Sequence, residues 1–418
     1  MTQRQSDKHP IRVGIIGVGR GQSFARGATD TVGMKLVALC DTWKEKLEQV
    51  GREYGVATYT DYHRFLEHDM DAVILANYSH EHAPFAIKAL QAEKHVMSET
   101  AACKTLAEGV ALCRAVEASG RIYMFAENYP FSSANQELRR LYRSGEIGNV
   151  TYAEGEYNHA AEEDWRLGIS PGLNHWRNWI PPTYYCSHAL APLMCITGTM
   201  PVSVNALSIV EEPTQSPHRV RVGDQGGLIL VRMDNGAVFR ILGLQLSSVH
   251  RVRYEIHGER GLIATAEPNH WNCVRIHHED WLRDRGQPLD RTYTADWPEH
   301  GDLARKAGHG GGDFWTNFHF ARAIRSGRQP YLNVYRGVAM AAVGVQAWRS
   351  CLEDGGPFPI PDFRRKTACR PYVADHWSPY PEDAGPGQPP PSTRGYVKPG
   401  SDAIRYARER WRGLGYEG

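Results

Sequence analysis

The segment from Tyr184 to Pro192 places an imidazole next to two phenols, because His188 closely follows Tyr184 and Tyr185. An imidazole can take the proton of an alcohol while hydride leaves its carbon, and a neighbouring tyrosine beside a cation can serve as a second acid or base. A single histidine of this kind is more often structural. Its interpretation therefore depends on the residues around it.

A second group of side chains suits a sugar. Between Glu154 and Trp179 the chain interleaves aromatic rings with charged and polar groups. Ring faces stack on the C–H face of a pyranose, and polar groups hydrogen-bond its hydroxyls. A plain aromatic core is the alternative, although it would carry fewer charged neighbours. The candidate residues are Tyr157, His159, Trp165, Arg166, Trp176 and Arg177.

Polar residues also follow three of the expected strands. They are His80-Glu81-His82, Glu99 and Glu127-Asn128. In open α/β sheets, ligands bind just beyond the carboxyl ends of parallel strands. For each histidine, a helix-cap or packing role is the alternative.

The clearest binding signal is Ile11 to Gly21, an apolar run that passes into Gly17-x-Gly19-x-Gly21. Glycines let the backbone turn sharply and approach a pyrophosphate, which a helix N-terminus attracts. The third position of the usual fingerprint is Gln22 rather than Gly or Ala. A following strand ends at Asp41, which would hold the ribose hydroxyls and favours NAD over NADP. A glycine-rich turn in some other α/β domain is the alternative.

These residues require a parallel sheet to position them. Strands and helices alternate up to Ala126, which predicts a doubly wound α/β Rossmann domain over residues 1–130. Strand-like runs then predict an α+β domain over 131–354 with a large, mostly antiparallel open sheet, including a hairpin at Asp234-Asn235-Gly236. Residues 355–418 are predicted to be a Pro/Gly-rich extension that wraps a neighbour or stays mobile, ending in a solvated basic helix.

Composition excludes several classes of protein. The 418 residues carry 48 Lys+Arg and 47 Asp+Glu, so no charge excess favours nucleic acid or an anionic membrane. No apolar run approaches the roughly 20 residues of a membrane span, and the polar start is not typical of a signal peptide. None of the cysteines forms a Cys-x-x-Cys pair, and Cys40 and Cys113 are expected to be buried thiols. We therefore expect a cytoplasmic protein with no nucleic-acid or membrane partner.

The order of these motifs resembles the glucose-fructose oxidoreductase, inositol dehydrogenase and MocA (Gfo/Idh/MocA) superfamily over nearly all of residues 10–365. This resemblance implies NAD as cofactor and a homodimer or homotetramer. Ordinary dehydrogenases of the superfamily carry a lysine after the residue that matches Glu99, whereas Thr100 stands here, and Tyr184 and Ala191 replace two aspartates near the catalytic histidine. The implied cofactor-binding residues are Gly17, Gly19, Arg20, Gly21, Gln22, Asp41, Asn77, His82, Glu99, Thr100, Asn128, Trp165 and Arg166.

Those departures coincide with a narrower resemblance, to the NAD-dependent α-N-acetylgalactosaminidases of glycoside hydrolase family 109. It rests on Glu99-Thr100-Ala101-Ala102, Glu127-Asn128, Gly155 to His159, Tyr185 to Pro192, Gly308 to Phe314 and Ile360 to Phe363. The resemblance implies catalytic roles for Glu127, Tyr157, Tyr185 and His188. It also places His309 and Asp313 near the substrate, and the expected substrate-binding residues are therefore His159, Trp176, Arg177, His309 and Asp313.

The mechanism implied by this resemblance is redox-neutral. Oxidation of the C3 hydroxyl of a small glycoside makes the C2 proton acidic, its removal expels the C1 aglycone, water adds, and the retained NADH reduces C3 again. His188 would handle the C3 hydroxyl proton, Tyr185 or Tyr157 would take the C2 proton, and Glu127 would orient or relay, without a metal. Two alternatives stay open. One is a sugar or cyclitol dehydrogenase that releases NADH, and the other is a sugar-nucleotide or NAD sensor without turnover.

Overall fold

The computed structural model describes residues 9–27, 30–159, 163–210, 219–244, 250–266 and 272–416. The chain forms two compact units. Unit 1 comprises Met1–Ser133, Asp296–Val338 and Phe363–Ala374, and unit 2 comprises Ala134–Ala295, Ala339–Asp362 and Asp375–Gly418. The expected division into three consecutive parts differs from these units, because two segments beyond residue 295 return to unit 1 and the last segment belongs to unit 2.

Unit 1 is built on a six-stranded sheet with the order β3-β2-β1-β4-β5-β6. All neighbouring strands are parallel, as the alternation of strand and helix predicts. This confirms the predicted Rossmann domain. The strands are β1 (Ile11–Ile16), β2 (Met34–Cys40), β3 (Ala57–Tyr59), β4 (Ala72–Leu75), β5 (His95–Ser98) and β6 (Tyr123–Phe125). The helices are α1 (Gly21–Ala25), α2 (Lys44–Tyr54), α3 (Tyr62–Leu66), α4 (His82–Gln91), α5 (Leu106–Ser119), α9 (Gly301–Ala304), α10 (Gly312–Ser326) and α12 (Lys366–Cys369).

Local chemistry sets the ends of α5. The Thr105 side chain accepts a hydrogen bond from the Glu108 N–H, which satisfies a free amide of the first turn. Gly120 ends the helix in the left-handed conformation, with φ of 64°, and its N–H bonds to the Val116 carbonyl. Both ends of α5 are therefore set by residues next to it in the sequence.

Unit 2 is built on a nine-stranded sheet with the order β14-β13-β12-β11-β7-β10-β9-β8-β15. Only the β7–β10 pair is parallel among the pairs of described strands, so the predicted mostly antiparallel sheet is confirmed. Gly236, with φ of 89°, turns β9 into β10 at the predicted hairpin. The strands are β7 (Val150–Asn158), β8 (Pro201–Ile209), β9 (Gly226–Met233), β10 (Val238–Leu244), β11 (Arg251–Gly258), β12 (Gly261–Thr265), β13 (Cys273–His278), β14 (Asp290–Thr294) and β15 (Phe358–Pro359). The helices are α6 (Ser133–Arg143), α7 (Glu163–Ile169), α8 (Ser187–Thr197) and α13 (Ser401–Gly413), and α11 (Val334–Leu352) contributes residues to both units.

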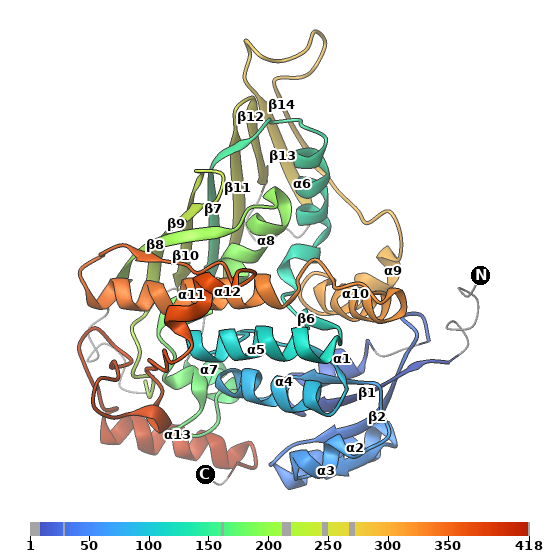
Figure 1. Cartoon of the computed structure of the whole chain (residues 1–418), viewed down its shortest axis with the longest axis vertical. Coiled ribbons are helices and arrows are strands. Elements are labelled where there is room, and N and C mark those ends of the chain that lie inside the picture. The colour runs from blue at the N-terminus through green and yellow to red at the C-terminus, as the bar shows by residue number, and fades with distance from the viewer. Residues whose placement is uncertain are drawn as a thin grey trace. The chain divides into compact units, whose positions relative to one another are not determined.

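Helix α8 packs on one face of this sheet, against β7 and β11 (Figure 1). Its close approach requires a glycine, because a Cβ on Gly155 would come within 2.1 Å of the Ala189 carbonyl oxygen. The hydroxyl of Tyr254 on β11 donates to the His188 carbonyl at 2.7 Å. The sheet therefore fixes the first turn of α8, which carries His188.

The Pro/Gly-rich segment within residues 355–418 packs against its own chain. The buried carboxylate of Asp224 accepts hydrogen bonds from the hydroxyls of Ser392 and Thr393, and the Trp348 indole donates to the Pro390 carbonyl. These contacts within unit 2 correct the expectation of a tail that wraps a neighbour or stays mobile, since the segment covers its own unit.

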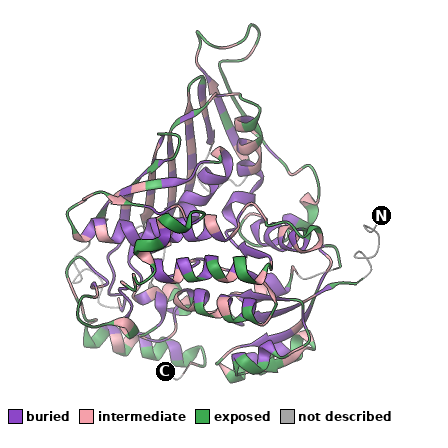
Figure 2. Ribbon diagram, in the orientation of Figure 1, coloured by how far each residue is buried: buried purple, intermediate pink, exposed green. Residues whose placement is uncertain are grey.

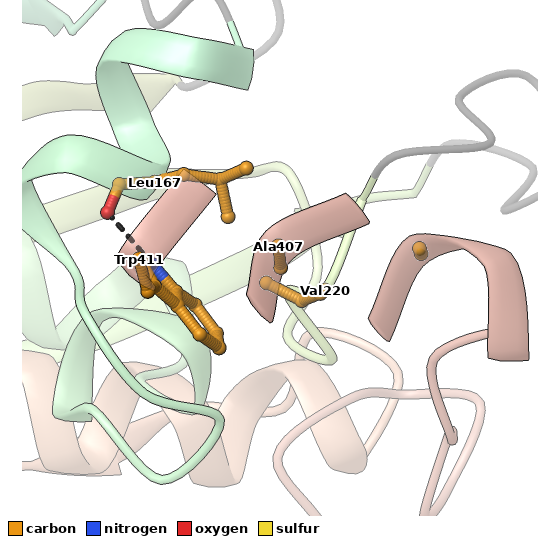
Figure 3. Close-up of a cluster of buried hydrophobic side chains, with 5 residues drawn as sticks. Leu167, Val220, Ala407 and Trp411 are labelled. Carbon is orange, nitrogen blue, oxygen red and sulfur yellow. Dashed lines mark hydrogen bonds between the residues drawn. The ribbon is translucent and has the colours of Figure 1, made fainter. Parts of the chain in front are cut away.

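Helix α13 is solvated on one side only. Ala403, Ala407 and Trp411, spaced by one turn, pack on Leu167 and Val220, and the Trp411 indole donates to the Leu167 carbonyl at 2.9 Å (Figure 3). Its arginines lie on the other side. The prediction of a solvated helix is therefore wrong for the apolar face of α13, which is buried.

The two sheets form the cores of the units, and their strands are largely buried, whereas the covering helices alternate buried and exposed faces (Figure 2). Cys40 and Cys113 are buried free thiols, as predicted. None of the helices in the described part of the chain has the length and hydropathy that a bilayer span requires.

Candidate active site

The glycine turn of unit 1 is shaped by close backbone contacts. Gly17 has φ of 92°, and a Cβ there would come within 2.2 Å of the Ala76 carbonyl oxygen. A Cβ on Gly21 would meet the Ile15 side chain at 2.7 Å, whereas one on Gly19 would meet no atom within 4 Å. The first and third glycines are thus required by packing, and the open position at Gly19 leaves the backbone accessible to a ligand.

Gln22 and Asp41 hold this turn in place. The Gln22 amide donates to the Val18 carbonyl at 2.8 Å, so the residue that departs from the fingerprint closes the turn. Asp41 accepts hydrogen bonds from the Val18 N–H at 2.7 Å and from the Trp43 N–H at 2.8 Å. A carboxylate has about four acceptor positions, so capacity is left for ribose hydroxyls.

Two buried amide oxygens at the carboxyl edge of the same sheet fit a dinucleotide. The Oδ1 atoms of Asn77, after β4, and Asn128, after β6, have no hydrogen-bond partner in the described part of the chain. Buried acceptors of this kind normally have a donor, and a ribose hydroxyl or a carboxamide would supply one. With the glycine turn and Asp41, these residues fit NAD.

The His82 ring lies between two backbone carbonyls of unit 1. The ring is buried, and its nitrogens lie 2.9 Å from the Ala101 carbonyl oxygen and 3.2 Å from that of Asn77. Burial lowers the pKa of this imidazole. Both nitrogens face backbone carbonyls, which is what the packing alternative predicts, and the assignment of His82 to cofactor binding stays a prediction.

Arg20 is the centre of a buried ionic cluster in unit 1. Its Nε lies 2.6 Å from Glu99, and its two terminal nitrogens contact the Asp313 carboxylate at 2.6 and 3.0 Å. Asp313 also accepts from His309 Nδ1 at 2.9 Å and from the Asn128 amide at 3.2 Å. The predicted residues Arg20, Glu99 and Asp313 therefore come together, but they bind one another.

This cluster fixes the charges of its members. Burial by itself would raise the pKa of Asp313, but hydrogen bonds from His309 and Arg20 lower it below its usual range. Burial would also raise the pKa of Glu99, but the charge of Arg20 together with the hydrogen bonds from the Thr100 N–H and from Arg20 lowers it. Asp313 is only 2% exposed, whereas the His309 side chain is 41% exposed. Of these two members of the predicted substrate-binding set, His309 is therefore the more accessible.

Thr100 and Glu127 complete the predicted residues of unit 1. The Thr100 N–H donates to the Glu99 carboxylate at 3.1 Å. Glu127 is completely buried. The assignments of these two residues to cofactor binding and catalysis stay predictions.

Unit 2 brings together the rings that the sequence singled out. The Tyr157 ring lies 4.6 Å from that of His188 and 5.9 Å from that of Tyr185, and the Tyr185 and His188 rings are 4.9 Å apart. Tyr157 comes from the end of β7, Tyr185 from the turn before α8 and His188 from its first turn. We call these three residues the ring cluster.

Further aromatic residues extend the ring cluster. The His159 ring lies 5.6 Å from that of Tyr157 and 4.8 Å from that of Trp165, to which it is tilted by 35°. His250, just before β11, lies 5.9 Å from both Tyr157 and His159. Sequence reasoning missed His250 because no motif surrounds it and only the β7–β11 pairing brings it there. The predicted cofactor contacts of Trp165 and Arg166 stay predictions.

Arg177 contacts both Trp176 and Tyr185. Its guanidinium lies 4.3 Å from the centre of the Trp176 ring, and its Nη1 is 3.5 Å from the Tyr185 hydroxyl. The backbone N–H of Arg177 bonds to the His175 ring, which helps to fix the turn. Stacked and planar, this guanidinium is preorganised for a ligand.

Models of known families match successive parts of the chain. Residues 11–127 match an oxidoreductase family with an NAD-binding Rossmann fold, named Gfo/Idh/MocA, and residues 135–264 match a Gfo/Idh/MocA C-terminal domain. Residues 245–369 match the C-terminal domain of glycosyl hydrolase 109.

Individual relatives agree with these matches. A glycosyl hydrolase family 109 protein of Solibacter usitatus is 25% identical over 398 residues, which cover 85% of this chain and 88% of that protein. One of Streptomyces filamentosus is 26% identical over 402 residues, covering 85% and 78%. The structure of levoglucosan dehydrogenase in complex with NADH and levoglucosan is similar in fold, with a TM-score of 0.71 at 20% identity, covering 84% of this chain and all 100% of the other. Since both units match its models and the glycine turn fits the dinucleotide, this chain belongs to the Gfo/Idh/MocA family of NAD-binding oxidoreductases.

Proposed function

We propose that this protein is an NAD-dependent glycosidase that hydrolyses a small glycoside without net oxidation. The observation that carries the proposal is the ring cluster, which gathers one imidazole and two phenols with ring centres 4.6 to 5.9 Å apart. The match of residues 245–369 to a glycosyl hydrolase 109 domain supports it.

The proposal divides the chemistry between the units. Gly17, Gly19, Asp41, Asn77 and Asn128 of unit 1 would hold NAD, which accepts hydride from C3 of the sugar and later returns it.

The ring cluster of unit 2 would move the protons. His188 takes the proton of the C3 hydroxyl as that carbon is oxidised, and Tyr185 or Tyr157 removes the proton from C2, so that the C1 aglycone leaves. Glu127, being fully buried, suits an orienting role better than contact with the sugar.

A two-carboxylate hydrolysis receives less support from unit 2. The two glutamates that precede the ring cluster on β7 already have basic partners. Glu154 is paired with Arg240, and Glu156 lies 3.3 Å from Arg251.

Turnover of aryl glycosides by the NAD-loaded protein tests the proposal. We expect release of the phenol without accumulation of NADH absorbance, and product formed in heavy water should carry deuterium at C2. Phenol release without that label would indicate direct displacement and would contradict the proposed route.

The second candidate is a net sugar dehydrogenase, because the fold is that of levoglucosan dehydrogenase. Thr100 in place of the lysine expected for such enzymes weighs against it. Accumulation of NADH in the same assay, in proportion to sugar consumed, would establish this alternative.

A homodimer or homotetramer remains our proposal for the assembly. Val202, Leu207 and Leu230 on β8 and β9 leave apolar side chains exposed on the open sheet of unit 2. A second copy could cover them, and light scattering of the purified protein would test this.

A further inference from the structure

Four arginines of unit 2 lie close enough together for their charges to interact, and one of them, Arg177, contacts Tyr185 of the ring cluster. Arg177 is on the turn before α8, Arg166 is on α7, and Arg219 and Arg221 belong to the segment 219–224. That segment is tied to the turn, because the Val222 N–H donates to the Asn178 carbonyl at 2.9 Å and Arg221 Nη2 donates to the Ile180 carbonyl at 3.1 Å. Of these four arginines, only Arg166 and Arg177 were predicted from the sequence as site residues.

Arg221 is the unusual member. It is 4% exposed, and its Nε and Nη1 atoms have no hydrogen-bond partner in the described ranges of the chain. Burial, together with the positive charges of Arg166, Arg219 and Arg177, lowers the pKa of this guanidinium well below its ordinary value. A buried charge without a partner is strongly unfavourable, so this arrangement requires an explanation.

The carboxylate of Asp224 does not supply the hydrogen bonds that Arg221 lacks. Its charge favours the protonated form of Arg221, but its oxygens accept hydrogen bonds from neutral groups, namely Ser208, Ser392 and Thr393. The carboxylate therefore anchors the C-terminal segment.

Other arginines of unit 2 behave differently. Arg240 is paired with Glu154 and Arg251 with Glu156, on strands adjacent to the ring cluster. Arg177, in contrast, has its guanidinium against Trp176 and Tyr185 and forms no ion pair with any residue in the described segments. Arg177 and Arg221 thus differ from these paired arginines, since neither forms an ion pair with a residue that the structure describes.

We propose that the sugar bound by unit 2 carries an anionic group, a carboxylate or a phosphate, which Arg177 receives by a forked hydrogen bond while the buried charge of Arg221 strengthens the attraction. This inference rests on the proposed function, because it assigns the ring cluster to a sugar. The dinucleotide pyrophosphate has its own site at the glycine turn, so Arg177 and Arg221 are left for a second anion. Guanidinium groups suit both carboxylate and phosphate geometry.

Calorimetric titration of the NAD-loaded protein with matched sugar pairs tests the inference. The pairs are glucuronate against glucose, galacturonate against galactose, and glucose 6-phosphate against glucose. We expect the anionic member of at least one pair to bind at least tenfold more tightly, with a preference that falls as salt is added. The pair that shows the preference distinguishes a carboxylate from a phosphate.

Three variants locate the effect. Arg177→Gln should abolish the preference, and Arg221→Met should reduce it severalfold. Arg240→Gln removes the same formal charge from a paired arginine and should leave the preference unchanged. NAD affinity, measured for each variant, reports whether unit 1 is intact.

Arg221→Met has a second readout that separates binding from structure. Because the substitution removes an unpaired buried charge, we expect the thermal midpoint of the ligand-free protein to rise while the anion preference falls. A lower midpoint with an unchanged preference would show that Arg221 is structural and would overturn its proposed role.

Equal affinity for the two members of every pair would overturn the anionic substrate, while leaving the glycosidase proposal in place if aryl glycosides are still cleaved. Failure of every sugar to bind, with NAD still bound, would overturn both proposals. Binding of inorganic sulfate without any sugar preference would identify an anion site unrelated to the sugar and would also contradict the inference.

Discussion

Arg20 in unit 1 and Arg177 in unit 2 are both partly buried arginines of candidate sites, yet their surroundings are opposite. Arg20 contacts two carboxylates, Glu99 and Asp313, at 2.6 Å each. Arg177 stacks on an indole, and its buried neighbour Arg221 has two nitrogens without partners in the described residues.

The contrast separates two uses of charge. Charges that are neutralised within the chain hold loops in position, and the Arg20 cluster does so for the glycine turn and the loops after β5 and β6. A charge that is buried without a partner keeps its attraction for an external group. The two units thus differ in what their arginines leave available to a ligand.

The largest effects are expected from variants that remove the function of one unit and leave that of the other intact. His188→Ala should lower turnover by about 10²- to 10⁴-fold, the usual contribution of an acid–base residue, and leave the Kd for NAD unchanged. Asp41→Ala should do the converse, weakening NAD binding first. Steady-state kinetics and NAD titration measure both, and near-normal turnover of His188→Ala would disprove the role of His188.

Asp313→Asn should break the ionic cluster around Arg20. Breaking a buried pair costs about 3–5 kcal/mol of unfolding free energy, and we expect the lower end because Glu99 still pairs with Arg20. Asp302→Asn is the matched control in unit 1, since Asp302 pairs with the exposed Arg305 and should show little change in denaturant unfolding. Equal stability of the two variants would argue that the cluster holds nothing in place.

The same cluster should make unit 1 sensitive to acid. The pKa values of Asp313 and Glu99 are lowered in the folded state. Their stabilisation is therefore present above the unfolded-state values of about 4 and is lost as the pH falls through the lowered folded values. Unfolding free energy measured from pH 7 downwards should decline less steeply in Asp313→Asn than in the unchanged protein. Parallel curves would contradict this assignment.

The smallest effect concerns the turn itself. Gln22→Ala removes the hydrogen bond to the Val18 carbonyl, which is worth about 1 kcal/mol. We expect NAD affinity to weaken by roughly fivefold, with sugar binding to unit 2 unaffected. Unchanged NAD affinity would show that the glycines alone hold the turn.

Local patterns determined much of this protein. Alternating strands and helices indicated the Rossmann sheet, and the cap at Gly120 and the hairpin at Gly236 followed from the need for positive φ at those positions. The Tyr185–His188 spacing also placed these two residues together, because it spans one turn of chain entering α8. Such features depend on neighbours in sequence, so a single sequence suffices to predict them.

Tertiary contacts decided the rest. His250 lies next to Tyr157 because β11 pairs with β7. Arg221 is buried because the 219–224 segment lies against residues 178–180. Asp313 binds Arg20 across 293 positions of sequence. Whether a charge is paired or left unpaired depends on residues that are distant in the chain, and that distinction marks the candidate site of unit 2.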